Sequence, residues 1–149
     1  MAIAPTLHLE AARRTDLALV RAFVRGHAEA TGLAAEAVDD LVQAVDEMAT
    51  NVLVHGYRGR PGPLTVQVDA GAGELRVRLR DDAPPFDPRQ WEPPDRVVPW
   101  GRRRPGGFGI PLSRGCVDEI DHRAAEADGA AGNELTLVKR GTRSEREPA

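Results

Sequence analysis

The stretch Asp39–Tyr57, which reads DDLVQAVDEMATNVLVHGY, decides how this chain folds. Apolar side chains recur along it at intervals of three and four residues, the spacing that gathers them on one side of an α-helix. At about 100° per residue they cover an arc of roughly 140°. The sequence therefore predicts an amphipathic helix that Gly56 ends. Its apolar side consists of Val38, Leu41, Val42, Val45, Met48, Ala49, Val52 and Leu53.

The opposite side of this helix carries Glu47 and Asn51, which are four residues apart and therefore share one face. Such a face is ordinarily solvated. Here it also holds Ala44, Val54 and His55. A mixture of small, apolar, acidic and amide groups fits a helix that is covered on its second side by something polar. Both interpretations remain open from the helix alone.

The composition is that of one soluble globular domain of 149 residues, with 41% apolar and 29% charged residues. The net charge of −3 does not indicate a nucleic-acid-binding protein. A single cysteine, Cys116, excludes an internal disulfide and a multi-cysteine zinc site, and we expect it to be a small buried hydrophobe. There is no apolar run of about 18 residues and no signal-peptide pattern, so a cytoplasmic protein without membrane contact is expected.

The remaining segments predict an α+β fold. A second helix is expected over 16–30, with Thr15 and Asp16 as candidate N-caps and Gly32 at its end. Because helices and strands segregate, we expect a two-layer α/β sandwich: a mixed, mostly antiparallel sheet with helices on one face. We assign 1–140 to a single domain and 141–149 to a polar, disordered tail. Alternating residues predict strands at 6–11, 64–68, 75–80, 117–125 and 135–138, with a hairpin turn at 70–73.

Residues 82–109 show no period and are rich in proline and glycine. A loop of this length in a compact domain is usually functional or mobile. Its part Arg89–Pro105 contains Trp91, Trp100 and three consecutive arginines, Arg102–Arg104. Tryptophan and arginine are enriched at binding hot spots, whereas a solvated basic loop is the alternative.

Three motifs fall on these elements in a definite order. The first is Glu47-x-x-x-Asn51 with His55-Gly56-Tyr57 after it, on the helix. The second, Asp81–Pro88 (DDAPPFDP), follows a strand. The third, Gly106–Leu112 (GGFGIPL), begins a short helix that runs to about Cys116. Each motif is weak alone, but together they resemble the N, G1 and G2 boxes of the GHKL ATPases, whose ATP-binding domain is the Bergerat fold. The chain looks most like the small anti-sigma factors that are also serine-protein kinases, over about residues 6–140.

The residue types suit the roles that this resemblance implies. An amide oxygen such as that of Asn51 is a hard, neutral ligand for a Mg²⁺ ion that bridges phosphates. Glu47, one turn earlier, is positioned to orient or deprotonate an attacking hydroxyl group. Asp81 would accept a hydrogen bond from the adenine amino group, as the aspartate of the G1 box does in the family. The alternatives are a solvated Glu47 and an Asp81 that caps its own turn.

The glycines of the third motif would let the backbone approach a phosphate at a helix N-terminus, where free N–H groups and the helix dipole favour anions. A glycine-rich turn alone is more often only a turn. With the other two motifs beside it, we assign it to the nucleotide. The resemblance implies nucleotide contacts at Asn51, Asp81, Ala83, Phe86, Gly106, Gly107, Phe108, Gly109 and Ile110.

The chain departs from the family pattern at three places. Ala83 and Pro85 stand where the ATPases usually have glycine, although the sequence Pro-Phe-Asp-Pro matches the small branch. A positive φ at position 83 would cost an alanine about 1 kcal/mol. In the last strand Asn133 follows Gly132, where many relatives place a threonine.

The resemblance implies a protein that binds ATP and Mg²⁺, phosphorylates a serine of an antagonist protein, and sequesters a sigma factor in a partner switch. It implies no direct contact with nucleic acid. The apolar edge near 6–24 is a candidate for homodimer formation. One alternative is a module that binds ATP, or no nucleotide, and sequesters its partner without phosphoryl transfer. The other is an α+β interaction domain whose motifs are coincidental.

Overall fold

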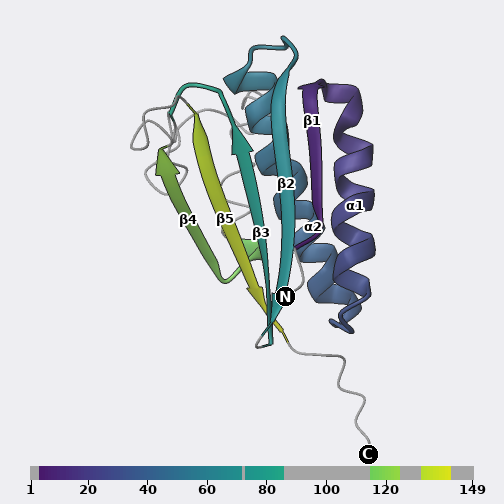
Figure 1. The fold of residues 1–149 in the computed structure, drawn as a ribbon. Helices are drawn as coiled ribbons and strands as arrows, with labels where there is room; N and C mark the ends of the chain where they lie inside the picture. Colours follow the sequence, from purple (N-terminus) through teal and green to yellow (C-terminus); the bar gives the residue numbers. More distant parts are fainter. Residues whose placement is uncertain (1–3, 72, 86–114, 125–131, 142–149) are drawn as a thin grey trace, which may run out of the picture.

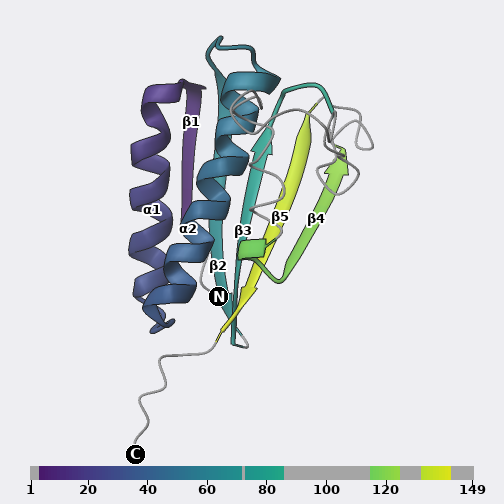
Figure 2. The same cartoon turned by 180° about the vertical axis from the view of Figure 1, so that it is seen from behind.

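The protein is an antiparallel sheet covered on one face by two helices (Figures 1 and 2). A computed structural model describes residues 4–71, 73–85, 115–124 and 132–141. The five strands have the order β1-β2-β3-β5-β4. The elements in chain order are β1 (Thr6–Ala12), the 3-10 turn η1 (Arg14–Asp16), α1 (Leu17–Glu29), α2 (Ala35–Thr50), the π-helix η2 (Asn51–Gly56), β2 (Gly62–Gly71), β3 (Glu74–Asp81), β4 (Glu119–Ala124) and β5 (Asn133–Arg140).

The predicted α+β layout with helices on one face is confirmed. All four strand pairings are antiparallel, so the described strands form an antiparallel sheet and not a mixed one. The predicted edge strand is β1, which pairs with β2 at one border of the sheet. The short helix predicted from Ile110 to about Cys116 lies mostly outside the described residues.

Alternation of side chains gives the sheet a dry face and a wet face. In β3, Leu75, Val77 and Leu79 are buried, and the arginines between them point to the other face. The same alternation holds in β2, whose part from Leu64 to Gly71 pairs with the whole of β3. Gly71 lies opposite Glu74, and Gly73 has a φ of +78°, which closes the predicted hairpin with a glycine in the left-handed region.

The core lies between the dry face and the two helices. Burial of each large aliphatic side chain contributes about 1.5–3 kcal/mol, so the apolar side of α2 is the main attachment of the helical layer. Cys116 is half-buried against this core, and burial raises the pKa of its thiol. The largest fully buried side chains are Leu41, Leu64, Leu75, Leu79, Leu137, Val20, Val24, Val38, Val45, Val66 and Val77.

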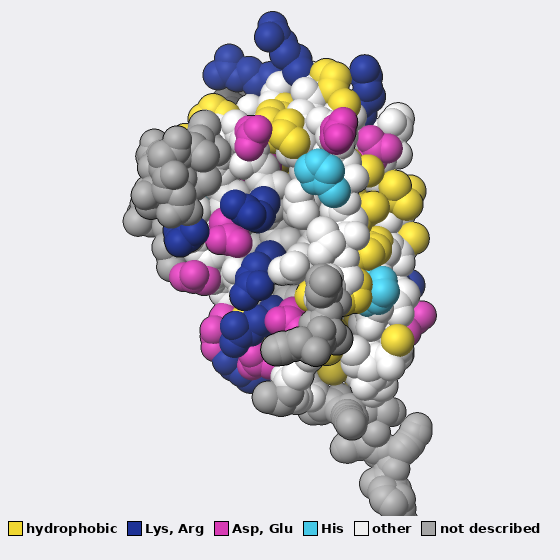
Figure 3. Space-filling view, in the orientation of Figure 1, with side chains coloured by type: hydrophobic (Ala, Val, Ile, Leu, Met, Phe, Trp, Pro, Cys, Tyr) yellow, Lys and Arg dark blue, Asp and Glu magenta, His cyan; other side chains and the backbone are white. Residues whose placement is uncertain are grey.

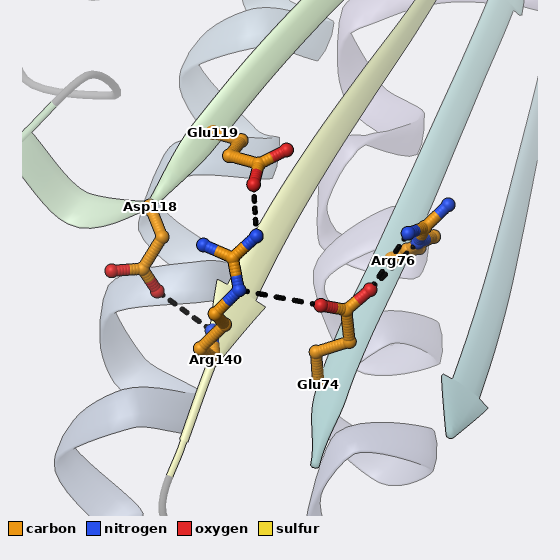
Figure 4. A network of polar contacts seen from close by, with 5 residues as sticks. All are labelled: Glu74, Arg76, Asp118, Glu119 and Arg140. Atoms are coloured by element: carbon orange, nitrogen blue, oxygen red, sulfur yellow. Dashed lines mark hydrogen bonds and ion pairs between the residues drawn. The ribbon is translucent and has the colours of Figure 1, made fainter. Parts of the chain in front are cut away.

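The wet face carries acidic and basic side chains over β3, β5 and β4 (Figure 3). At one end of these strands they form a network around Arg140, which contacts Glu119 and Glu74 (Figure 4). Glu74 also binds Arg76 at 2.8 Å, and the Asp118 carboxylate accepts the Arg140 backbone N–H at 2.6 Å. The network joins three strands, but exposed ion pairs contribute only about 0–1 kcal/mol each.

The long predicted helix begins earlier than the expected Asp39 and changes its type before it ends. It starts at Ala35, and its α-helical part stops at Thr50. From Asn51 to Gly56 the helix widens into a π-helix, and the Tyr57 N–H donates to the Val52 carbonyl oxygen at 2.8 Å. Gly56 does end the helical segment, as predicted. Wide turns of this kind occur often at functional sites, and here the turn contains Asn51.

Of the two predicted N-caps, Asp16 does stand at the N-cap position of α1, but its side chain makes no capping hydrogen bond to that helix, and Thr15 lies within the preceding turn. Asp16 has a helical backbone, and the preceding turn is a 3-10 turn. The Asp16 carboxylate accepts the Arg13 backbone N–H at 2.8 Å, so Asp16 acts from the third position of that turn. An acidic side chain can stabilise a helix start from either place, and the sequence does not distinguish them. The expected end of this helix is close, since α1 finishes at Glu29.

Tyr57 connects the end of the helical layer to two strands. Its hydroxyl donates to the Pro63 carbonyl oxygen at 2.6 Å and accepts the Asp82 backbone N–H at 2.7 Å. The ring packs so closely on Gly62 that a Cβ there would lie 2.5 Å from it. Burial raises the pKa of Tyr57 to about 12. Tyr57 therefore positions the residue that follows Asp81.

We expect Tyr57→Phe to lower the free energy of unfolding by about 1–3 kcal/mol, because it leaves a carbonyl oxygen and an N–H group without their partner while the ring packing stays. Urea denaturation followed by far-UV circular dichroism measures this change. Arg58→Ala, next to it and exposed, is the control and should stay near wild type. Equal midpoints for Tyr57→Phe and wild type would contradict the structural role.

Candidate functional site

Two of the three motifs meet at one end of the molecule. The end of α2, with η2, lies at the same end of the sheet as the last residues of β3 and the first residues of β5 (Figure 2). A Cβ added at Gly56 would lie 2.8 Å from the Cβ of Ala83, so the first and second motifs are in contact. The third motif, Gly106–Leu112, lies outside the described residues, as do Phe86 and the tryptophan-containing segment 89–105.

Ala83 fits its position without backbone strain. Among the described residues, Arg58 is the only non-glycine residue with a positive φ, so the possible cost at position 83 does not arise. Ala83 is buried, and its methyl group fills the space that Gly56 leaves by lacking a side chain. The departure from glycine at position 83 is therefore accommodated on the facing helix.

Asp81 is a buried carboxylate at the end of β3, with 6% of its surface exposed. One of its oxygens, Oδ1, accepts the Ala83 backbone N–H at 2.8 Å and the Asn133 side-chain N–H at 2.9 Å. Within the described part of the chain its other oxygen, Oδ2, accepts no hydrogen bond. Burial raises the pKa of Asp81, and the two hydrogen bonds oppose that rise because they favour the ionised form.

Asn133 and His122 complete this cluster. The Asn133 amide nitrogen also lies 3.2 Å from the Pro84 carbonyl oxygen and 3.3 Å from that of Ala83. Its oxygen lies 2.7 Å from Nε2 of His122. Neither residue was predicted to belong to the site. The register of β3 and β5 places Asn133 opposite Asp81, and the pairing of β4 with β5 brings His122 beside it. Neither register can be read from local patterns.

Gly132 allows β5 to begin this close to Asp81. A Cβ at Gly132 would lie 1.9 Å from the Asp81 carbonyl oxygen, and its φ is +114°. Both the space and the backbone conformation therefore require glycine.

Glu47 and Asn51 lie on a side of the helix that is covered and not plainly solvated. Both are half-buried, and Ala44 on the same side is fully buried. Oε1 of Glu47 and Nδ2 of Asn51 are buried without a hydrogen-bond partner. Buried polar atoms are normally paired, so this arrangement favours a polar ligand on this side. Of the two interpretations of the helix face, the structure supports the covered one.

Burial raises the pKa of the Glu47 carboxyl group, and the charge of Asp46 adds to the rise. A hydrogen bond from Gln43 to Oε2 of Glu47, at 3.1 Å, acts in the opposite direction. The bond occupies Oε2 and leaves Oε1 unpaired. A carboxylate in this state can accept a proton from a bound molecule.

The sequence profile of the histidine kinase-like ATPase domain matches residues 10–139. The chain belongs to this family. The serine-protein kinase RsbW of Listeria monocytogenes is 32% identical over 109 residues, which cover 70% of this chain and 69% of that protein. The serine-protein kinase RsbW of Bacillus cereus is 26% identical over 113 residues, or 73% and 71% of the two chains.

Solved structures agree on the fold. The RsbU and RsbW domains of Rv1364c from Mycobacterium tuberculosis match 99% of this chain and 35% of that chain, with a TM-score of 0.63 and 21% identity. A mycobacterial sensor histidine kinase, MprB, matches 95% of this chain with a TM-score of 0.50 and 16% identity. The expected family and fold are confirmed, and membership of an ATPase-domain family makes ATP the expected nucleotide. No helix in the described ranges is long and apolar enough to span a membrane.

Asp81→Asn should change how stability depends on pH. The pKa of Asp81 is higher in the folded chain than in the unfolded chain, where it is near 3.8. Folding stability therefore falls as pH rises from the unfolded pKa through the folded one. The asparagine variant lacks this loss, so its stability relative to wild type should increase from about pH 4 until the pH passes the folded pKa of Asp81.

Urea denaturation across this pH range measures the difference. Asp69→Asn removes an exposed carboxylate on β2 that lies far along the sheet from Asp81, and it is the matched control, which should follow the wild-type profile. A constant difference between Asp81→Asn and wild type at all pH values would show that burial does not perturb Asp81.

Proposed function

We propose that this chain is an ATP-dependent serine-protein kinase that also acts as an anti-sigma factor. It would bind Mg-ATP at the end of α2, phosphorylate a serine of an antagonist protein, and sequester a sigma factor in a partner switch. The observation that carries the proposal is the pair of buried, unpaired polar atoms on Glu47 and Asn51, one helical turn apart. Similarity to the RsbW serine-protein kinases names the reaction class.

Asp81 is the proposed acceptor for the adenine amino group. Its Oδ1 is occupied by two N–H groups, whereas Oδ2 accepts none from the described residues. An ionised carboxylate only accepts hydrogen bonds, so it fits an exocyclic amino group and repels a carbonyl oxygen in the same place. Ala83 packs beside it. We propose Phe86 and Gly106–Ile110 as further nucleotide contacts on the basis of the family motifs.

Asn51 is the proposed Mg²⁺ ligand. Its amide oxygen is a hard, neutral ligand, which suits this cation. The buried, unpaired atom of the amide is its nitrogen, a hydrogen-bond donor that suits a phosphate oxygen. In the described ranges, His, Cys, Asp and Glu form no cluster of three or more that could hold a metal ion. This fits an ion that is held mostly by phosphates. When bound, Mg²⁺ would neutralise charge on the phosphates, and Asn51 would fix where it sits.

Glu47 is the proposed general base. The phosphoryl group would move from the bridging oxygen of ATP to the serine Oγ, and the serine proton would move to Oε1 of Glu47. Gln43 holds the other oxygen at 3.1 Å and so orients the carboxylate. The raised pKa brings Glu47 closer to neutral pH, which improves a general base. Positioning and electrostatics supply the rest of the catalysis in phosphoryl transfer.

A second copy of the chain is proposed to bind at a surface outside the nucleotide site. Leu19 on α1 is a large hydrophobic residue with 48% exposure, and β1 next to this helix is an edge strand. This region, 6–24, is the proposed homodimer contact. We also propose that the protein works in the cytoplasm, as its sequence predicts.

Glu47→Gln should bind ATP as wild type does and transfer phosphate about 10²–10⁴-fold more slowly, because the amide keeps the shape but cannot take the proton. The assay follows γ-phosphate transfer to the cognate antagonist protein. Asp46→Asn changes the adjacent carboxylate, which pairs with Arg21 at 2.8 Å, and should retain most of the activity. Unchanged transfer by Glu47→Gln would remove its role as base. A wild type that binds the antagonist but never phosphorylates it would establish the sequestration module instead.

Asn51→Ala should lose Mg²⁺-dependent ATP binding itself. A ligand present at 100 times its Kd stabilises a protein by about 2.7 kcal/mol, so wild type should show a clear thermal shift with Mg-ATP and a smaller one with ATP and EDTA. The variant should show the same small shift in both. Gln43→Ala, on the same helix, is the control and should keep the Mg²⁺ effect. Equal Mg²⁺-dependent shifts for Asn51→Ala and wild type would exclude Asn51 as the ligand.

A further inference from the structure

We propose that Asn133 determines the nucleobase specificity of the site. Its amide group donates a hydrogen bond to one oxygen of Asp81 and leaves the other oxygen available to bind the base. His122 fixes the orientation of this amide. Asn133 acts through Asp81 and need not touch the nucleotide, so it is a positioning residue. The inference rests on the proposed ATP site and adds how this chain selects adenine.

The hydrogen bonds to Asp81 are divided unequally between its two oxygens. Oδ1 accepts from the Ala83 N–H at 2.8 Å and from the Asn133 amide at 2.9 Å. A carboxylate oxygen has about two lone-pair positions, so Oδ1 is saturated. Oδ2 keeps both of its positions with respect to the described residues. The donor of a ligand is therefore directed to Oδ2 alone.

Three oxygens and one imidazole define the orientation of the Asn133 amide. Its nitrogen faces Oδ1 of Asp81 and the carbonyl oxygens of Pro84 and Ala83. Its oxygen faces Nε2 of His122 at 2.7 Å. A flipped amide would place its oxygen against three other oxygens. Because the amide oxygen only accepts, Nε2 of His122 carries the hydrogen.

The same contacts keep Asp81 in the state that reads an amino group. Burial favours the protonated carboxyl group, and the bond from Asn133 is the largest influence that lowers the pKa of Asp81. Without it, the buried carboxyl group would hold a proton more readily and would then be a donor. A donor at Oδ2 no longer matches the amino group of adenine.

Asn133 also joins the residues after β3 into one unit. Its amide reaches the carbonyl oxygens of Ala83 and Pro84 as well as the carboxylate. Gly132 lets this strand approach the Asp81 backbone closely. The side chain of Asp81 is therefore held from β5 as well as from its own turn, which restricts where Oδ2 can point.

The test compares ATP with purine riboside 5′-triphosphate, which has a hydrogen in place of the amino group and is otherwise the same. Both Kd values are measured by calorimetry with Mg²⁺. One hydrogen bond to a charged group gives wild type a preference for ATP of about 10- to 100-fold. Asn133→Leu has a similar shape and no donor. We expect its preference to fall to about threefold or less, with little change in the Kd of the purine analogue.

Two further variants make the result specific. Thr136→Val lies on the same strand but on the wet face and should keep the wild-type preference. His122→Leu leaves Asn133 in place and removes the imidazole that faces its amide oxygen, so it should lower the preference by a smaller factor. It also provides the measurement if Asn133→Leu does not fold.

The outcomes separate the inference from the proposed function. A wild type that binds neither nucleotide would contradict the proposed ATP site. A wild type that prefers ATP, with variants at positions 133 and 122 that prefer it equally, would overturn the role of Asn133 and leave the proposed function intact. Equal weakening of both nucleotides in Asn133→Leu would show a purely structural role and would also overturn the inference.

Discussion

The burial of the Asp81 carboxylate is the constraint on which the site depends. A charge in this position is costly unless donors meet it, and the fold supplies two, the Ala83 N–H and the Asn133 amide. The Asn133 donor requires β5 to start directly opposite the end of β3, which in turn requires glycine at position 132. The register of the sheet therefore has a second role besides burying aliphatic side chains. It supplies the donor that favours the ionised form of Asp81, the group proposed to recognise the base.

The helical layer is joined to the same end of the sheet by one packing contact and two hydrogen bonds. Gly56 accepts the methyl group of Ala83, and Tyr57 bonds both the Asp82 N–H and the Pro63 carbonyl oxygen. These contacts lie at the end of the π-helix that begins at Asn51. The widened turn is what brings Gly56 and Tyr57 to the end of β3. Glu47 and Asn51, one turn apart on the same helix, are held relative to Asp81 through this junction.

The sequence predicts the elements well because each carries a local period. The apolar stripe from Val38 to Leu53 and the alternation in β2 and β3 identify the helix and the hairpin without any tertiary information. Prediction from the sequence fails where a contact between residues that are distant in the chain determines the local structure. The π-helix, the helix start at Ala35 and the role of Asn133 depend on neighbours that are far away in the chain. Asp81 and Ala83 were placed in the site by motif resemblance, while their environment, including the harmless φ of Ala83, needed the structure.

The two carboxylates of the site show how one cause gives two chemical roles. Burial raises the pKa of both Asp81 and Glu47. At Asp81, a backbone N–H and an amide stabilise the charge, so the group is kept as a fixed hydrogen-bond acceptor. At Glu47, Gln43 pairs with one oxygen and the other stays buried and unpaired. The ionised form of Glu47 is thus stabilised by fewer hydrogen bonds than that of Asp81. Protonation of its unpaired oxygen removes the cost of keeping this charge buried. Asp81 must stay ionised to act as an acceptor, whereas Glu47 must gain a proton to act as a base. The number of hydrogen-bond donors that each carboxylate receives therefore distinguishes their roles, and the residue type does not.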